Sequence, residues 1–160
     1  MHHTPDPVLL LRELRRVLRP SGTMNVMVYN YDSLWLHLYV AYQKCLVEGR
    51  FEGMDIRAAF AKTTDGEDCP ISKVYRPAEF LALAREAGLD GEFTGAAVSM
   101  YEASLLPKRY DAVRDMRLRE ESRQFLLDLE INRFGFPVYR NHYAGVDGCY
   151  RLCLRHSLAN

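Results

Sequence analysis

The sequence predicts an α/β fold with a small sheet. Stretches in which apolar residues recur every three or four positions alternate with short, continuously apolar stretches, and turn residues separate them. Over the 160 residues this pattern predicts, in order, a helix, a strand, a helix, an irregular stretch, a helix, a strand, a helix and a strand. No linker divides the chain, so we expect a single domain over residues 1–160.

The first half of the chain opens with a helix over residues 8–18, for which Asp6 is a suitable N-cap and Pro7 suits the first helical position. A Pro-Ser-Gly turn at 20–22 leads into a strand over 23–29. This strand is apolar almost throughout, which predicts that it is covered on both faces. A helix with a broad apolar side follows over 34–48.

The second half begins with a polar, turn-rich stretch over 49–73, in which we expect only a short helix at 56–61. Another helix is predicted over 78–87, ended by Gly88 in a left-handed conformation. Strands are expected over 92–101 and 148–154, and a long, charged amphipathic helix over 111–132 lies between them.

Composition and charge exclude several classes of protein. The 21 basic and 21 acidic residues cancel, which argues against a general nucleic-acid binder. No stretch approaches the roughly 20 apolar residues of a membrane helix, and no secretory signal is present, so we expect a cytoplasmic protein. The four cysteines match no zinc-site spacing, so reduced thiols and no metal site are predicted; they are Cys45, Cys69, Cys149 and Cys153.

Two stretches carry a resemblance to a known family. One reads HHTPDP at 2–7, continues as a helix that ends in LRRVLRPSGT at 14–23, and leads into the apolar strand. The other runs from YRPAEF at 75–80 to EAGL at 86–89, and GVDGCYRL at 145–152 follows as a final strand. This arrangement is similar to class I S-adenosylmethionine-dependent methyltransferases of the type 11, or UbiE-like, family. There a His-His pair ends strand four, and an Arg-Val-Leu-Lys-Pro-Gly-Gly turn precedes strand five; here Arg19 and Ser21 replace the Lys and the first Gly.

The resemblance implies a partial Rossmann-like fold. The family's strand order is three-two-one-four-five-seven-six, and this chain would retain strands five, six and seven with their flanking helices. The family binds its cofactor with a Gly-x-Gly-x-Gly loop and an acidic residue at the end of strand two, and neither occurs in these residues. We therefore expect the chain to correspond to the C-terminal half of the fold, with strand five exposed as an edge.

The function implied by the resemblance is transfer of a methyl group from S-adenosylmethionine to a small-molecule or lipid-like acceptor in an intact relative. The chain alone is expected to be inactive. The alternative is a non-catalytic interaction module, or a subunit of a split methyltransferase. In that case strand five would pair with an N-terminal half or with a second copy. By family position, His2 and His3 are the candidate cofactor-binding residues, and no residue is assigned a catalytic role.

Five further residues are candidate substrate contacts. Ligands of open α/β sheets bind beyond the carboxyl ends of the strands, where the loop after strand five would lie. The alternative interpretation assigns the first residue of this loop to the core and the second to turn formation. A second polar and aromatic group lies just before the final strand. The candidates are Tyr29, Asn30, Tyr31, His142 and Tyr143.

Overall fold

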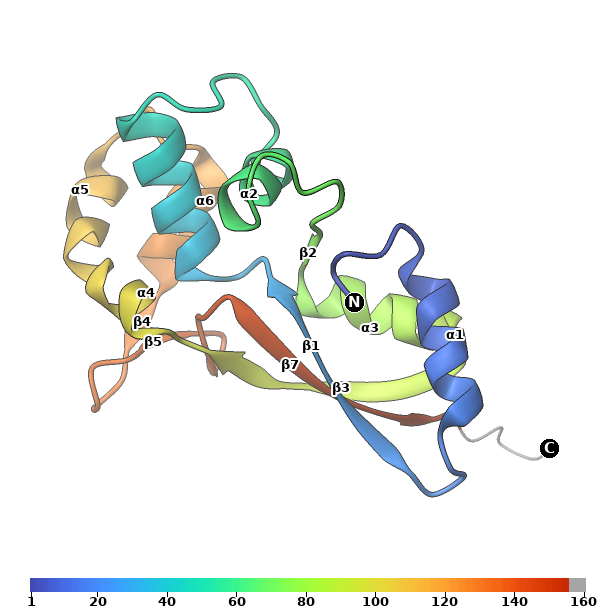
Figure 1. Ribbon diagram of the computed structural model, residues 1–160. Helices are drawn as coiled ribbons and strands as arrows, with labels where there is room; N and C mark the ends of the chain where they lie inside the picture. Colours follow the sequence, from blue (N-terminus) through green and yellow to red (C-terminus); the bar gives the residue numbers. More distant parts are fainter. Residues whose placement is uncertain (156–160) are drawn as a thin grey trace.

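The computed structural model describes residues 1–155 and is built on a four-stranded sheet of order β2-β1-β7-β3 (Figure 1). β1 and β2 run parallel, whereas β7 lies antiparallel between β1 and β3. The predicted α/β class is confirmed at this level, as a mixed α/β fold with a curled mixed sheet. The strands are β1 (Thr23–Asn30), β2 (Val74–Tyr75), β3 (Leu89–Ala97) and β7 (Asp147–Leu154).

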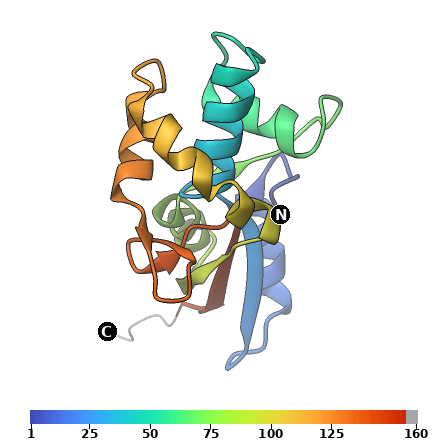
Figure 2. The same ribbon diagram turned by 90° about the vertical axis from the view of Figure 1, so that its left-hand side faces the viewer.

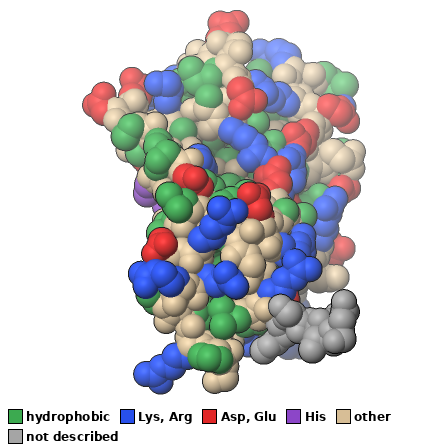
Figure 3. All heavy atoms as spheres, turned by 90° about the vertical axis from the view of Figure 1, so that its right-hand side faces the viewer, with side chains coloured by type: hydrophobic (Ala, Val, Ile, Leu, Met, Phe, Trp, Pro, Cys, Tyr) green, Lys and Arg blue, Asp and Glu red, His purple; other side chains and the backbone are tan. Residues whose placement is uncertain are grey.

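Two helices, α1 (Pro7–Val17) and α3 (Pro77–Glu86), cover one face of this sheet (Figure 1). The predicted N-cap is confirmed, because the Asp6 carboxylate accepts a hydrogen bond from the Leu9 N–H at 2.8 Å. The cluster between helices and sheet includes the fully buried Leu11, Val28 and Phe80. On the outside of this layer, basic and acidic side chains are spread over the surface (Figure 3).

The opposite face of β1 is open, so the prediction of a strand covered on both sides is wrong. Asn25 is exposed, and the Met27 side chain keeps 44% of its surface in contact with solvent. Arg151 of the neighbouring strand β7 is exposed on the same face. The prediction failed because alternate residues of β1 face opposite sides of the sheet, and helices cover only one of these sides.

The outer edge of β1 is covered only at its carboxyl end. β2 pairs with Tyr29 and Asn30, and residues 23–28 have no strand partner on that side within the described part of the chain. The predicted exposed edge is therefore present over 23–28, while a short segment of the same chain occupies the neighbouring position at the end of the strand. Val28 is fully buried all the same, because the helices cover its face.

A layer of helices lies beyond the carboxyl end of β1 (Figures 1 and 2). Its largest member, η1 (Trp35–Val47), is a π-helix, in the position of the helix predicted over 34–48. A second hydrophobic cluster fills this layer, with Leu36, Phe60 and Leu126 fully buried. The other members are α2 (Ile56–Thr64), α4 (Met100–Ser104), the 3₁₀ turn η2 (Leu106–Lys108), α5 (Arg109–Arg114) and α6 (Glu120–Asp128).

The structure corrects two predicted elements. The strand expected over 92–101 spans Leu89–Ala97, and Ser99 caps the new helix α4 through a hydrogen bond from the Glu102 N–H. The helix expected over 111–132 is broken into α5 and α6, because the Asp115 carboxylate accepts a hydrogen bond from the Arg117 N–H and closes a local turn. None of the helices within residues 1–155 has the length and apolar character needed to cross a bilayer.

A small antiparallel sheet precedes the final strand. Its three short strands, β4 (Glu130–Ile131), β5 (Pro137–Tyr139) and β6 (His142–Tyr143), pair in sequence order. Only two residues, Arg140 and Asn141, connect β5 to β6. The chain then passes through Gly145 into β7, so that this hairpin lies next to the carboxyl end of β1.

Candidate functional site

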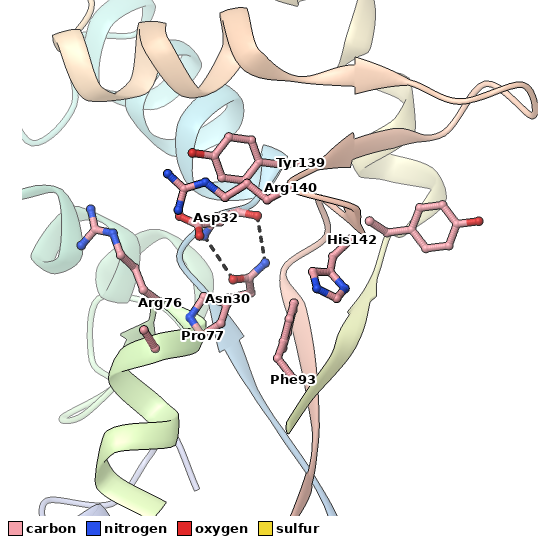
Figure 4. A pocket seen from close by; sticks show the side chains of 10 residues that line it. Asn30, Asp32, Arg76, Pro77, Phe93, Tyr139, Arg140 and His142 are labelled. Carbon is pink, nitrogen blue, oxygen red and sulfur yellow. Dashed lines mark hydrogen bonds between the residues drawn. The ribbon is translucent and has the colours of Figure 1, made fainter. Parts of the chain in front are cut away.

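A cavity of about 320 Å³ lies beyond the carboxyl end of β1 (Figure 4). Its walls come from the loop after β1, the start of α3, the strand β3 and the β5–β6 hairpin. This is the place where open α/β sheets bind ligands, and the volume suits a small organic molecule. The lining residues are Asn30, Asp32, Arg76, Pro77, Ala78, Phe93, Tyr139, Arg140, His142 and Tyr143.

A two-residue turn closes the β5–β6 hairpin. Arg140 and Asn141 both have positive φ angles, 48° and 68°, which is the type I′ geometry of two-residue hairpin loops. Asparagine tolerates this left-handed conformation, whereas arginine pays a steric penalty. The His142 ring packs edge to face against Phe93 of β3 at 4.8 Å and holds the hairpin over the cavity. A strained residue at the rim of a cavity is a pointer to function.

Asn30 forms the floor of the cavity and is fully engaged by the protein. Its side-chain amide donates to the carbonyl oxygen of Asp32 at 2.8 Å, and its amide oxygen accepts from the Asp32 N–H (Figure 4). The same side-chain amide also donates to the carbonyl oxygen of Gly145 at 3.0 Å. The residue is only 1% exposed. Asn30 therefore ties the loop after β1 to the chain entering β7, and its polar atoms are already used by the backbone.

Asp32 is the acidic group of the cavity. Its carboxyl is partly buried, and this desolvation raises its pKa above the ordinary value, although the positive charges of Arg76 and Arg140 act in the opposite direction. A carboxylate with a raised pKa holds protons more readily than a surface aspartate. Asp32 can thus accept a proton or a hydrogen bond from a molecule in the cavity.

The two arginines of the cavity differ in how they are compensated. Arg76 pairs with Glu79 and Glu121, and its guanidinium lies 3.9 Å from the centre of the Tyr31 ring. Arg140 stacks on Tyr139 at 5.0 Å, and it forms no ion pair within residues 1–155. Its charge is therefore the one available to an anionic group in the cavity.

The predicted substrate contacts divide into two groups. Asn30, His142 and Tyr143 line the cavity. Tyr29 and Tyr31 lie outside it: the Tyr29 hydroxyl donates to Asp65 at 2.9 Å, and the Tyr31 hydroxyl donates to Glu121 at 2.9 Å. Burial, reinforced by the Glu121 carboxylate, raises the pKa of Tyr31 to about 12, so its hydroxyl stays protonated.

The candidate cofactor-binding residues, His2 and His3, also lie away from the cavity. The His2 ring is buried against the ring of Tyr29, 4.0 Å between centres, and burial lowers its pKa to about 4. Nδ1 of His3 is 2.8 Å from the carbonyl oxygen of Ile71. Without a glycine loop or a ribose-binding acid, the described residues do not fit S-adenosylmethionine by themselves.

Sequence reasoning missed several residues of this cavity. Asp32 lies two positions beyond the strand, and the rule that identified Asn30 applies to it as well. Arg76 precedes the helix-opening Pro77, where it reads as a helix boundary rather than as a ligand-binding group. Arg140 carries no local signal, because nothing in the sequence reveals its left-handed backbone.

The comparisons with known proteins leave the family open: no family model matches the chain, and a search of the curated proteins finds no similar sequence. Three features bear on the function: the strand order, the cavity and the sequence resemblance.

Proposed function

We propose that this chain is the acceptor-binding part of a class I methyltransferase fold, and that its cavity takes a small-molecule methyl acceptor. The strand order carries the proposal. β1, β7 and β3 lie in the order expected for strands five, seven and six, and the antiparallel strand lies between the other two. The helices α1 and α3 precede strands five and six, as the resemblance implies, and both pack on one face.

The position of the cavity supports the same proposal. It lies at the carboxyl end of β1, the strand that corresponds to strand five. Aromatic rings of Phe93, Tyr139 and Tyr143 belong to its lining, while Asp32 and Arg140 supply opposite charges. This lining suits an acceptor with an apolar ring or chain and one anionic group, with Arg140 facing the anion and Asp32 near the group that loses a proton.

Cofactor binding separates this proposal from that of a self-sufficient enzyme. We expect the chain alone to bind S-adenosylmethionine no more tightly than the millimolar range, because it lacks the glycine loop and the ribose-binding acid. Isothermal titration measures this directly. A radiolabelled methyl-transfer assay is expected to show turnover only when the chain is combined with a polypeptide that supplies strands one to four. Micromolar binding or turnover by the lone chain would show that the proposal is wrong.

The cavity can be tested with one substitution that separates binding from folding. Arg140→Asn removes a cavity charge that forms no ion pair within residues 1–155, and it replaces a strained residue with one that tolerates positive φ. We expect the free energy of unfolding to rise by about 1 kcal/mol, because asparagine bears less of the cost of the left-handed conformation than arginine. Binding of small aromatic carboxylates, followed by NMR titration, should weaken at least tenfold. Arg133→Asn is the matched control, since Arg133 is an exposed arginine that does not line the cavity. Unchanged carboxylate binding in Arg140→Asn would contradict the assignment.

The second candidate function is that of a non-catalytic module or a subunit of a split methyltransferase, and one observation favours it. The outer edge of β1 has no strand partner over residues 23–28 within the described chain. Met27, within this stretch, is exposed. Open edges pair readily with other strands. Sedimentation analysis distinguishes the outcomes: self-association through this edge supports the module, whereas pairing only with a cofactor-binding half supports the split enzyme.

A further inference from the structure

Three side chains with metal-binding atoms meet at a place outside the cavity. His3 comes from the N-terminal segment, Asp65 from the end of α2, and Cys69 from the loop that leads to β2. One nitrogen, one carboxylate oxygen and one sulfur from these residues lie within 4.8 Å of one another. None of the three lines the cavity at the end of β1.

The His3 ring is oriented as a metal ligand would be. Its Nδ1 lies 2.8 Å from the Ile71 carbonyl oxygen, which only accepts hydrogen bonds, so this nitrogen carries the proton. Nε2 then presents its lone pair, and it lies 3.8 Å from Oδ1 of Asp65. Metal-binding histidines characteristically donate their other ring N–H to a backbone carbonyl in this way.

The Asp65 carboxylate is held in place by two hydroxyl groups. Oδ1 accepts a hydrogen bond from the Tyr29 hydroxyl at 2.9 Å, and Oδ2 accepts one from the Ser72 hydroxyl. Each oxygen keeps a further lone pair for another partner. Hydrogen bonds of this kind fix a ligating carboxylate, and they are as much a part of a metal site as the ligands themselves.

Cys69 completes the group. Its partly buried Sγ lies beside the His3 ring, 3.8 Å from Nδ1, and its thiol donates to the Ile71 carbonyl oxygen at 3.4 Å. A thiolate, an imidazole and a carboxylate around one zinc ion, bound at about 2.0–2.3 Å, would lie about 3.3–3.7 Å apart in tetrahedral geometry. The ligand atoms lie within 4.8 Å of one another, so inward rotation of the exposed His3 side chain and of the Cys69 thiol by about 1 Å brings them to those separations.

We propose that His3, Asp65 and Cys69 form a zinc site. The sulfur ligand favours zinc over magnesium or calcium, which take oxygen ligands, and three protein ligands leave the fourth tetrahedral position to water. The site joins the N-terminal segment to the loop before β2. No local pattern indicates this site, because one ligand is more than sixty residues from the other two and no spacing template applies.

The test uses the full chain without a polyhistidine tag, stripped of metal with a chelator. Titration with Zn²⁺ is expected to show one ion bound per chain, and Co²⁺ in its place is expected to give a thiolate-to-cobalt charge-transfer band. Cys69→Ser should abolish the band and weaken Zn²⁺ binding at least tenfold. Cys149→Ser on β7 is the matched control and should change neither.

Tyr29→Phe gives a second measurement that does not remove a ligand. It deletes the hydroxyl that orients Asp65, so Zn²⁺ affinity should fall by about 10–100-fold while the cobalt band is retained. Far-UV circular dichroism verifies that each variant is folded. Absence of one-to-one binding, a band that persists in Cys69→Ser, or a band that disappears in Cys149→Ser would overturn the proposal. These readouts do not depend on methyl transfer.

Discussion

Gly145→Ala is expected to destabilise the protein by about 3 kcal/mol or more, a large share of the roughly 5–15 kcal/mol that stabilises a domain. A Cβ atom at Gly145 would lie 1.7 Å from the carbonyl oxygen of Ala97 and 2.7 Å from the Val98 nitrogen. Both neighbours are backbone atoms at the end of β3, so no side chain can move aside. Chemical denaturation followed by circular dichroism measures the loss.

The substitution should also disturb the cavity, because Gly145 is hydrogen-bonded to Asn30, which forms the cavity floor. The Gly145 carbonyl oxygen accepts a hydrogen bond from the Asn30 side chain, and the backbone N–H of Asn30 donates to the Val146 carbonyl oxygen at 2.7 Å. Gly53→Ala is the control: its φ of 73° is also left-handed, but a Cβ there meets nothing within 4 Å. It should cost only about 1–2 kcal/mol. Equal losses of unfolding free energy in the two variants would show that the close approach of Gly145 to the backbone of residues 97 and 98 does not destabilise Gly145→Ala.

The sequence was sufficient for the elements with strong local signals. Asp6 caps α1 as predicted, and Gly88 follows α3 with a φ of 81°, the left-handed geometry of a helix end. β1 and β7 were identified from their apolar runs to within one residue at each end. In each case the residues that specify the element are neighbours in the sequence, so the signal survives without tertiary information.

The elements that the sequence did not reveal are short or depend on distant contacts. β2, β4, β5 and β6 have only two or three residues each, too few for a periodicity to emerge. The parallel pairing of β2 with Tyr29 and Asn30 depends on a crossover connection of more than forty residues. The break between α5 and α6 depends on one side-chain hydrogen bond at Asp115, which competes with the helical pattern.

The sequence likewise predicted only some of the residues that line the cavity. The rule that ligands bind beyond the ends of strands indicated Asn30, and the polar cluster before the last strand indicated His142, and both line the cavity. The same rule also selected Tyr29, which the structure turns toward Asp65. Successive residues of a strand point to opposite sides, so a rule that names a loop cannot say which of its side chains faces the ligand.

Acidification is expected to destabilise the protein through His37, a fully buried histidine of η1. Its Nδ1 is 3.0 Å from the Ser122 hydroxyl, and its ring stacks on Phe125 at 4.2 Å. Burial, together with the positive charge of Arg76, lowers the pKa of His37 from 6.5 to about 3. The folded protein thus excludes a proton that the unfolded chain binds readily.

The direction of the stability change and its pH range follow from the pKa of His37 in the unfolded chain, 6.5, and in the folded protein, about 3. Above pH 6.5 neither state binds the proton, and the contribution of His37 to stability is complete. Below that pH the unfolded chain is protonated first, so the free energy of unfolding falls until the pH reaches the folded pKa of about 3. With about 1.36 kcal/mol for each pKa unit, the loss at pH 4.5 is about 2–3 kcal/mol.

Urea denaturation of the unsubstituted protein and of His37→Gln, at pH values from 7 to 4.5, isolates this contribution. Other groups titrate in the same range: desolvation also lowers the pKa of His2, to about 4, and raises that of the buried Glu102 carboxyl. Their effects are common to both proteins and cancel in the difference. His37→Gln should be less stable than the unsubstituted protein at pH 7. The difference between their free energies of unfolding should shrink by about 2–3 kcal/mol at pH 4.5. A gap that stays constant across this range would show that His37 accepts a proton in the folded state.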